Sequence, residues 1–165
     1  MDPKPASDSA AQLVHWMGVG DANSTGNIHG GTVMKLVDEA AGLAAIKHSR
    51  RRVVTAGIDR MTFLYPIRVG ELVTFSATVN AAWRTSMEVG VRVEAENPLT
   101  GEVRHTNTAY LTMVSLDAAG EPARVPALIA TTPTEQRRER GAQLRRANRL
   151  AERAEILAHR EEEPR

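Results

Sequence analysis

Residues 23–48 read NSTGNIHGGTVMKLVDEAAGLAAIKH, and this stretch decides the fold of the chain. A polar loop leads into the pair Gly30 and Gly31, after which apolar residues recur with a period near 3.6. That periodicity predicts an α-helix from Thr32 to about His48. Alanine and glycine dominate its second half. Such small side chains let another element approach closely, so we expect the helix to be buried at the centre of the domain.

Four segments after the helix are rich in valine, threonine and aromatic residues and are bounded by turn signals, which is typical of β-strands. The predicted strands cover residues 53–63, 72–82, 87–96 and 103–116. In the third, Met87 and Val93 share one face while Glu88, Arg92 and Glu94 share the other, so one face should meet the core and one should meet water. One buried helix with four long strands predicts an α+β fold, an antiparallel sheet curled around a helix.

Composition narrows the class of protein. The chain has 165 residues, a formal net charge of +1 and no cysteine. That length suits one domain, and the balanced charge argues against nucleic acid or a membrane as the main partner. The missing thiols exclude disulfides, thiolate catalysis and cysteine-based zinc sites. We expect a cytoplasmic protein, since no apolar run is long enough to span a bilayer.

The chain divides into three parts by composition. Residues 1–9 are polar and predict a flexible N-terminus. Residues 10–130 hold nearly all of the apolar periodicity and predict one folded domain. Residues 131–165 are rich in arginine and glutamate and predict a charged C-terminal helical extension. Its sparse apolar positions are Leu144, Leu150, Ile156 and Leu157.

The loop and helix together suggest a catalytic site. Backbone N–H groups at a helix start have no intrahelical acceptor, so those of Gly30 and Gly31 can face a carbonyl oxygen that gains negative charge. Asp38 lies about two turns further on, where a carboxylate can act as a base or attack directly as a nucleophile. The structural alternatives are close packing at the helix entry for the glycines and an ordinary ion pair for Asp38. Glu39 lies about 100° around the helix from Asp38, so we interpret Glu39 as structural.

His29 precedes the glycines and suggests a metal or acid–base role. No second histidine follows at zinc-site spacing, so we expect no metal and interpret His29 as a loop residue that shapes the site.

Several motifs in order and spacing carry a family resemblance. They are the loop Asn23-x-x-Gly26-Asn27-Ile28-His29-Gly30-Gly31, residues 34–42 and 53–59, Phe63, the turn 67–71, residues 85–89 and the pair Val125-Pro126. Through them, residues 13–129 resemble the hotdog-fold acyl-CoA thioesterases, in the branch of YciA-type bacterial hydrolases and brain-type cytosolic acyl-CoA hydrolases.

The resemblance implies hydrolysis of acyl-CoA without metal or bound cofactor, coenzyme A being part of the substrate. It implies that Asn23 of one subunit and Asp38 of another share a site, with the Gly31 N–H as oxyanion donor and Thr55 as a further hydrogen-bonding group. Asn23 taken alone is more often a turn residue. A homodimer would hold two such sites, and three dimers would form a hexamer.

The nucleotide end of coenzyme A carries phosphates and calls for cations at the rim of the site. Arginine suits this because its planar guanidinium binds two oxygens at once. The candidate substrate-binding residues are Arg51, Arg52, Arg84 and Ser86 at the rim, with His29, Gly30 and Thr55 nearer the reacting carbonyl. A solvated loop is the structural alternative for the arginine run 50–52.

Two other functions use the same fold. A hotdog dehydratase or hydratase acting on acyl-CoA or an acyl carrier protein generally pairs a catalytic histidine with an acid, and His29 keeps that alternative open. A non-catalytic acyl-CoA sensor would bind the thioester without turnover.

Overall fold

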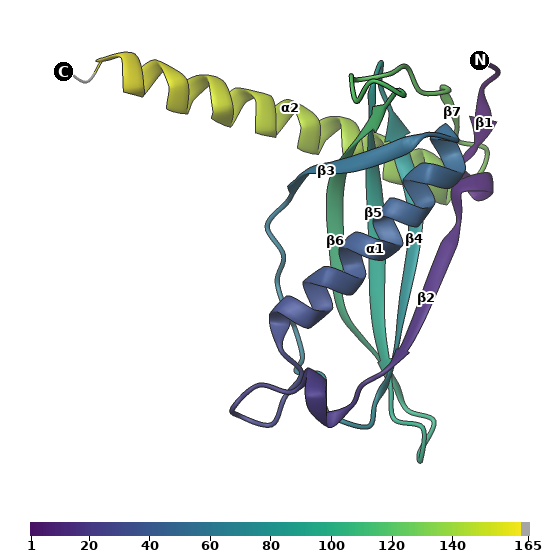
Figure 1. The fold of residues 1–165 in the computed structure, drawn as a ribbon, viewed down its shortest axis with the longest axis vertical. Coiled ribbons are helices and arrows are strands. Elements are labelled where there is room, and N and C mark those ends of the chain that lie inside the picture. Colours follow the sequence, from purple (N-terminus) through teal and green to yellow (C-terminus); the bar gives the residue numbers. More distant parts are fainter. Residues whose placement is uncertain (163–165) are drawn as a thin grey trace.

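The computed structural model describes residues 1–162, so the last three residues of the expected C-terminal extension lie outside it. A five-stranded antiparallel sheet, in the order β2-β4-β5-β6-β3, curls around α1, and α2 crosses its outer face (Figure 1). The main elements are β2 (Ala11–Trp16), α1 (Gly30–Ser49), β3 (Arg52–Ile58), β4 (Leu72–Ala82), β5 (Ser86–Glu96), β6 (Val103–Leu116) and α2 (Pro133–Glu162). The α+β prediction is confirmed.

Helix α1 lies in the concave face of the sheet, as its small residues predict. Its buried apolar side chains are Val33, Val37, Ala40, Ala41, Ala44 and Ala45, each at most 1% exposed. The helix starts two residues earlier than predicted because His29 caps its N-terminus. It ends where Arg50 takes a left-handed conformation, with φ of 54°. A left-handed residue after the last turn is a common way to stop a helix.

The predicted strands agree closely with β4, β5 and β6, whereas β3 ends at Ile58 and not at Phe63. Beyond Ile58 the backbone stays beside β6 through two hydrogen bonds, Asp59 N–H to the Tyr110 carbonyl (2.9 Å) and Leu64 N–H to the Thr106 carbonyl (3.0 Å). Strand β2 was not predicted. Its six residues form one edge of the sheet, and β3 forms the other.

Strand β3 contains a bulge. Thr55 pairs with Met113 and Gly57 pairs with Thr112, so Ala56 is an extra residue without a partner. An extra residue reverses the in–out alternation of a strand. Val53, Thr55 and Ile58 consequently pair with Ser115, Met113 and Leu111, the residues of β6 that face α1.

The outer face of the sheet does not simply meet water, so the prediction for Glu88 is wrong. Its side chain is 0% exposed because α2 covers it. Arg145 of α2 donates to Glu88 Oε1 at 2.6 Å, and Arg149 lies 3.5 Å from Oε2. The Arg145 guanidinium also stacks on the Tyr110 ring, 3.5 Å from its centroid. Helix α2 is therefore seated on the sheet mainly through arginine side chains.

The segment 1–9, expected to be flexible, contains two short elements. Strand β1 (Lys4–Pro5) pairs in parallel with β7 (Leu128–Ile129), and the 3₁₀-helix η1 (Ala6–Ser9) follows it. Ser9 is buried, and its hydroxyl accepts a hydrogen bond from the N–H of Val79 at 2.9 Å.

Candidate active site

Asp38 of α1 faces Thr55 of β3. Thr55 Oγ1 donates a 2.5 Å hydrogen bond to Asp38 Oδ1, and Met113 Sδ lies 3.5 Å from the same hydroxyl. Asp38 is half-buried and Thr55 is exposed, so the pair lies at the surface of a single chain. A carboxylate that one hydroxyl orients and solvent reaches on another side can hold a water molecule or accept its proton.

The loop before α1 fixes the orientation of Asn23. Its Oδ1 accepts hydrogen bonds from Thr25 N–H (2.9 Å), Thr25 Oγ1 (2.7 Å) and Asn27 N–H (3.3 Å). No acceptor for its Nδ2 lies among residues 1–162. The Asn23 side chain therefore stabilises the turn through its oxygen. Its Nδ2 remains available as a donor to a group from outside the chain.

A second residue anchors this loop. The carboxylate of Asp21 accepts from Gly18 N–H at 2.8 Å and lies 3.2 Å from His15 Nε2. The pKa of Asp21 is lowered, first by the Gly18 hydrogen bond and then by His15. The Asp21 carbonyl in turn accepts from His29 N–H, just before the helix begins.

The two glycines at the start of α1 differ in their hydrogen bonds. The Gly31 N–H, expected to face an oxyanion, donates to Nδ1 of His29 at 3.2 Å. No acceptor for the Gly30 N–H lies in the described part of the chain. His29 therefore occupies the Gly31 donor within its own chain. A substrate oxygen would have to replace the imidazole nitrogen there.

Two contacts at the site were not predicted. The ring of Phe63 covers Gly30, and a Cβ at Gly30 would lie 3.6 Å from its Cζ. Met113 contacts the Thr55 hydroxyl from the neighbouring strand. Strand register brings Met113 opposite Thr55, and a sequence pattern gives no signal for that register. Phe63 was noted only as part of the family motif.

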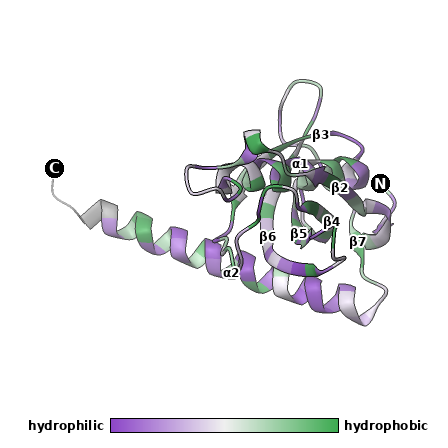
Figure 2. Ribbon diagram, turned by 90° about the horizontal axis from the view of Figure 1, so that it is seen from below, coloured by the Kyte–Doolittle hydropathy of each residue, from purple (hydrophilic) through white to green (hydrophobic). Residues whose placement is uncertain are grey.

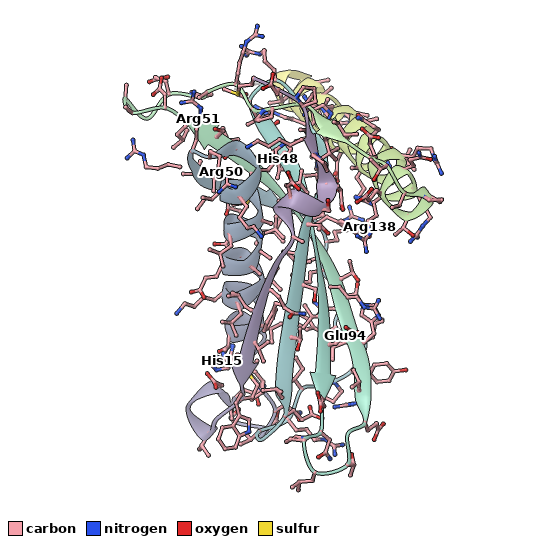
Figure 3. All side chains as sticks on the ribbon, turned by 90° about the vertical axis from the view of Figure 1, so that its right-hand side faces the viewer. His15, His48, Arg50, Arg51, Glu94 and Arg138 are labelled. Carbon is pink, nitrogen blue, oxygen red and sulfur yellow. The ribbon has the colours of Figure 1, made fainter. Side chains whose placement is uncertain are left out.

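The rim candidates gather at one end of the sheet. Arg52 and Ser86 pair with Leu116 and Val114 at the end of β6, and Arg84 lies in the adjoining turn. Arg51 lines a cavity of about 460 Å³ with Lys4, Ser49 and Arg50. Figure 3 shows Arg50 and Arg51 together at the C-terminal end of α1, close to His48.

Arg52 is engaged within its own chain. Its Nη2 donates to the carbonyl oxygens of Asp117 (3.0 Å) and Ala118 (3.1 Å), which secures the turn after β6. Arg51 makes no such bond within residues 1–162, so Arg51 is the better placed of the two for a phosphate.

These groups do not all meet within one chain. Asp38 and Thr55 are in contact, whereas Asn23 and the glycine pair lie at the N-terminal end of α1. Eight residues separate Gly30 from Asp38, about 12 Å along a helix axis. Among the rim residues, Arg51 lies at the opposite end of α1. A second chain is needed if Asn23 and Asp38 are to act on one substrate.

His48 lies buried beneath the rim. Its Nε2 donates to the Pro126 carbonyl at 2.9 Å, and its Nδ1 is buried without a partner among the described residues. Burial lowers the pKa of His48, although the Pro126 hydrogen bond opposes this. Burial of the ring therefore favours its neutral form.

Within residues 1–162, no cluster of three or more histidine, aspartate or glutamate side chains is suited to a metal ion. No helix in the same range is long and apolar enough to cross a membrane.

Comparison with known proteins places this site in a family. The family model described as the thioesterase superfamily matches residues 25–102. Protein VdlD of Helicobacter pylori is 39% identical over 128 residues, which cover 78% of this chain and 73% of that protein. This chain belongs to the thioesterase superfamily. The cytosolic acyl coenzyme A thioester hydrolase of Rattus norvegicus is 35% identical over 139 residues. Our chain spans only 36% of the length of that rat protein.

Solved structures agree with the membership of this chain in the thioesterase superfamily. An apo-hexameric acyl-CoA thioesterase has a TM-score of 0.90 at 38% identity, covering 93% of this chain and 99% of the other. The acyl-CoA hydrolase of Staphylococcus aureus, solved with butyryl coenzyme A, coenzyme A and coenzyme A disulfide, has a TM-score of 0.87 at 32% identity, covering 96% of each chain. Further structures of that hydrolase carry alanine in place of an aspartate, an asparagine and a threonine.

Proposed function

We propose that this protein is an acyl-CoA thioesterase that releases a carboxylic acid and coenzyme A, with Asp38 as the central catalytic group. The Thr55–Asp38 hydrogen bond carries the proposal, because it orients a carboxylate at the chain surface on the helix that the glycine pair begins. Relatives named as acyl-CoA thioester hydrolases support the reaction. The three positions replaced by alanine in the S. aureus hydrolase support the choice of site residues, since they have the same spacing as Asn23, Asp38 and Thr55.

In the proposed reaction, water attacks the thioester carbonyl carbon. Asp38 accepts the proton as the new C–O bond forms, or its carboxylate attacks first and water hydrolyses the resulting anhydride. The glycine N–H groups at the start of α1 stabilise the oxyanion. The C–S bond then breaks, and the coenzyme A sulfur leaves as a thiol after taking up a proton. The step requires no metal and no bound cofactor.

We further propose that two copies share each site. Asn23 Nδ2 of one copy donates to the water or thioester oxygen held by Asp38 of the other. Strand β3 supports this arrangement, because it is an edge strand with open backbone groups and exposed apolar side chains, Val54 at 47% and Ile58 at 37%. Three such dimers would form a hexamer, the assembly named for two structural relatives. The rat relative is named cytosolic, which supports a cytoplasmic location.

Thiol release from acyl-CoA tests the catalytic proposal. Asp38→Asn should lower kcat by about 10²–10⁴-fold, the usual contribution of a positioned base. Glu39→Gln is the matched control, since Glu39 lies on the same helix and pairs with Lys35 at 3.8 Å. An Asp38→Asn variant that folds normally and retains full turnover would contradict the proposal. Assaying hydration of an enoyl-CoA alongside separates a hydratase from a thioesterase.

A further inference from the structure

Helix α2 leaves its large apolar side chains exposed, although one of its faces covers the sheet. The side chains that meet the sheet are mainly arginines, among them Arg145 and Arg149. Leu150, Ile156 and Leu157 are 55%, 48% and 47% exposed. A helix that leaves its large apolar side chains in water usually has a partner that covers them.

The helix also extends past the edge of the sheet. Arg149 pairs with Asp59 at 2.6 Å and Glu152 pairs with Arg60 at 3.3 Å, so α2 is held where it crosses the end of β3. A cavity of about 250 Å³ between the two elements is lined by Ala56, Gly57, Thr112, Arg146, Arg149, Leu150 and Arg153. Beyond Arg153 the helix continues away from the sheet, as Figures 1 and 2 show.

The part of α2 beyond Arg153, here called the overhang, is long enough to reach over a strand added next to β3. Leu157 lies four residues beyond Arg153, about 6 Å further along the axis. A strand that joins β3 would lie about 4.8 Å away. Ile156 and Leu157 line a second cavity of about 390 Å³ with Arg149, Glu152 and Arg153, on the side of α2 that continues past β3. The first strand added at the edge would therefore lie under these two residues.

The outer face of β3 offers a complementary surface. Val54 pairs with Val114 of β6, and both point to the side opposite Asp38. Val54 is 47% exposed, and Ala56 is also exposed beside the cavity under α2, so the outer side of this edge strand presents apolar side chains. The overhang thus has apolar side chains that fit an apolar strand face, and the chain itself provides both.

Charge favours a second copy of this chain as the occupant. Arg146 and Arg153 flank the Ala56 cavity, and the overhang carries the exposed carboxylate of Glu155. In a two-fold dimer each α2 end would bring its Glu155 toward the arginines of the other copy. A two-fold interface requires such a self-complementary set of groups.

We propose that the end of α2 in one copy packs on the outer face of β3 in a second copy, with Ile156 and Leu157 against Val54 and Ala56. This inference rests on the proposed homodimer and extends it, because it assigns the C-terminal helix the role of a reciprocal clamp on the dimer. Each dimer would contain two such contacts, one from each copy.

Disulfide trapping tests the contact, because the chain has no native cysteine. The double variant Val54→Cys with Ile156→Cys should form a two-chain species on a non-reducing denaturing gel, since a disulfide needs Cβ atoms about 3.5–4.5 Å apart. The matched control is Val54→Cys with Leu144→Cys, because Leu144 lies on another face of α2. Val54→Cys alone measures any bond formed directly between two β3 strands.

A second measurement uses Ile156→Glu with Leu157→Glu, positions whose exposure in the single chain makes the protomer tolerant of change. Sedimentation should show the dimer dissociation constant raised by about tenfold or more, with Leu144→Glu unchanged. An active oligomer that neither cross-links at 54 and 156 nor weakens with the double glutamate would overturn this inference and leave the proposed function intact. A fully active monomer would overturn the clamp and the shared site together.

Discussion

Thr55 Oγ1 and Asp38 Oδ1 are joined by a 2.5 Å hydrogen bond that links the edge strand to the central helix. The hydroxyl donates, so it favours one orientation of the carboxylate and leaves the second oxygen for a ligand. Because β3 is the open edge, the same contact lies where a second chain would add. The geometry of Asp38 therefore depends on the strand that would form the subunit interface.

Removing this hydroxyl should slow turnover. Thr55→Val keeps the shape of the side chain but leaves the carboxylate without its donor, and a hydrogen bond to a charged group contributes about 1.5–3 kcal/mol. We expect kcat to fall at least about tenfold, and Thr55→Ser to retain most of the wild-type rate. Steady-state thiol release measures both variants. Equal rates for valine and serine would show that the hydroxyl does not act on Asp38.

Asn23→Asp is a sharp test of the asparagine. Aspartate keeps the oxygen that accepts from Thr25 and Asn27, so the loop should remain folded, but it lacks the Nδ2 donor. We expect kcat to fall by about 10²-fold with little change in the unfolding midpoint. A midpoint that falls with the rate would instead indicate a purely structural asparagine.

Subunit mixing tests whether the site is shared. If Asn23 and Asp38 come from different copies, unfolding and refolding equal amounts of Asn23→Asp and Asp38→Asn protein should restore activity. Half of the dimers would be mixed and each would hold one intact site, which gives about a quarter of the wild-type rate. Either variant refolded alone is the control. No recovery from a mixture with confirmed hybrid dimers would place both residues in one chain.

The two rim arginines should behave differently. Arg51→Ala should raise KM for acyl-CoA about tenfold with kcat nearly unchanged, because a phosphate contact lies far from the reacting carbon. Arg52→Ala should also lower the free energy of unfolding by about 1 kcal/mol, since the Asp117 and Ala118 carbonyls lose their donor. Urea unfolding and steady-state kinetics separate the effects, with Arg140→Ala as a surface control. An unchanged KM for Arg51→Ala would remove that residue from the substrate site.

His48 should make folding stability depend on pH. Its pKa is lowered in the folded state, so the unfolded chain binds a proton that the folded chain excludes. Stability is then fully present above the unfolded pKa of about 6.5 and declines as pH falls below it. His48→Gln should flatten that decline between pH 7.5 and 5.5 in urea unfolding. A wild-type-like decline in His48→Gln would assign the effect to other groups.

The sequence predicts the helix and three long strands well because their signals are local. Periodicity identifies α1, and its alanines correctly indicate close packing. The prediction that Glu88 meets water is wrong for the opposite reason. Its burial depends on Arg145 of α2, which lies 57 positions later in the chain. Strand β2 was missed because its alternate residues are only partly buried and its outward side chains include Val14 and Trp16.

In the candidate site, too, local motifs could be predicted from the sequence, whereas contacts between distant segments could not. The loop and the glycines could be found from their motif, but the hydrogen bond from Gly31 to His29 could not, because helix caps are usually serine, threonine, aspartate or asparagine. Glu39 was interpreted as structural, and it forms an ion pair with Lys35. The contact of Thr55 with Asp38 depends on strand register, which becomes fixed only when β3 pairs with β6.

The unpaired Ala56 limits which insertions and deletions β3 can tolerate during evolution. Thr55 faces inward in regular register, and the extra residue that follows it returns Ile58 to the inner face, so the side chains beyond the bulge depend on the count of residues and not only on their identity. Substitutions that keep the number of residues leave the two faces of the strand as they are. A single-codon insertion or deletion would instead exchange the two faces on one side of the change, so that either Thr55 would leave the carboxylate or Ile58 would leave the inner face.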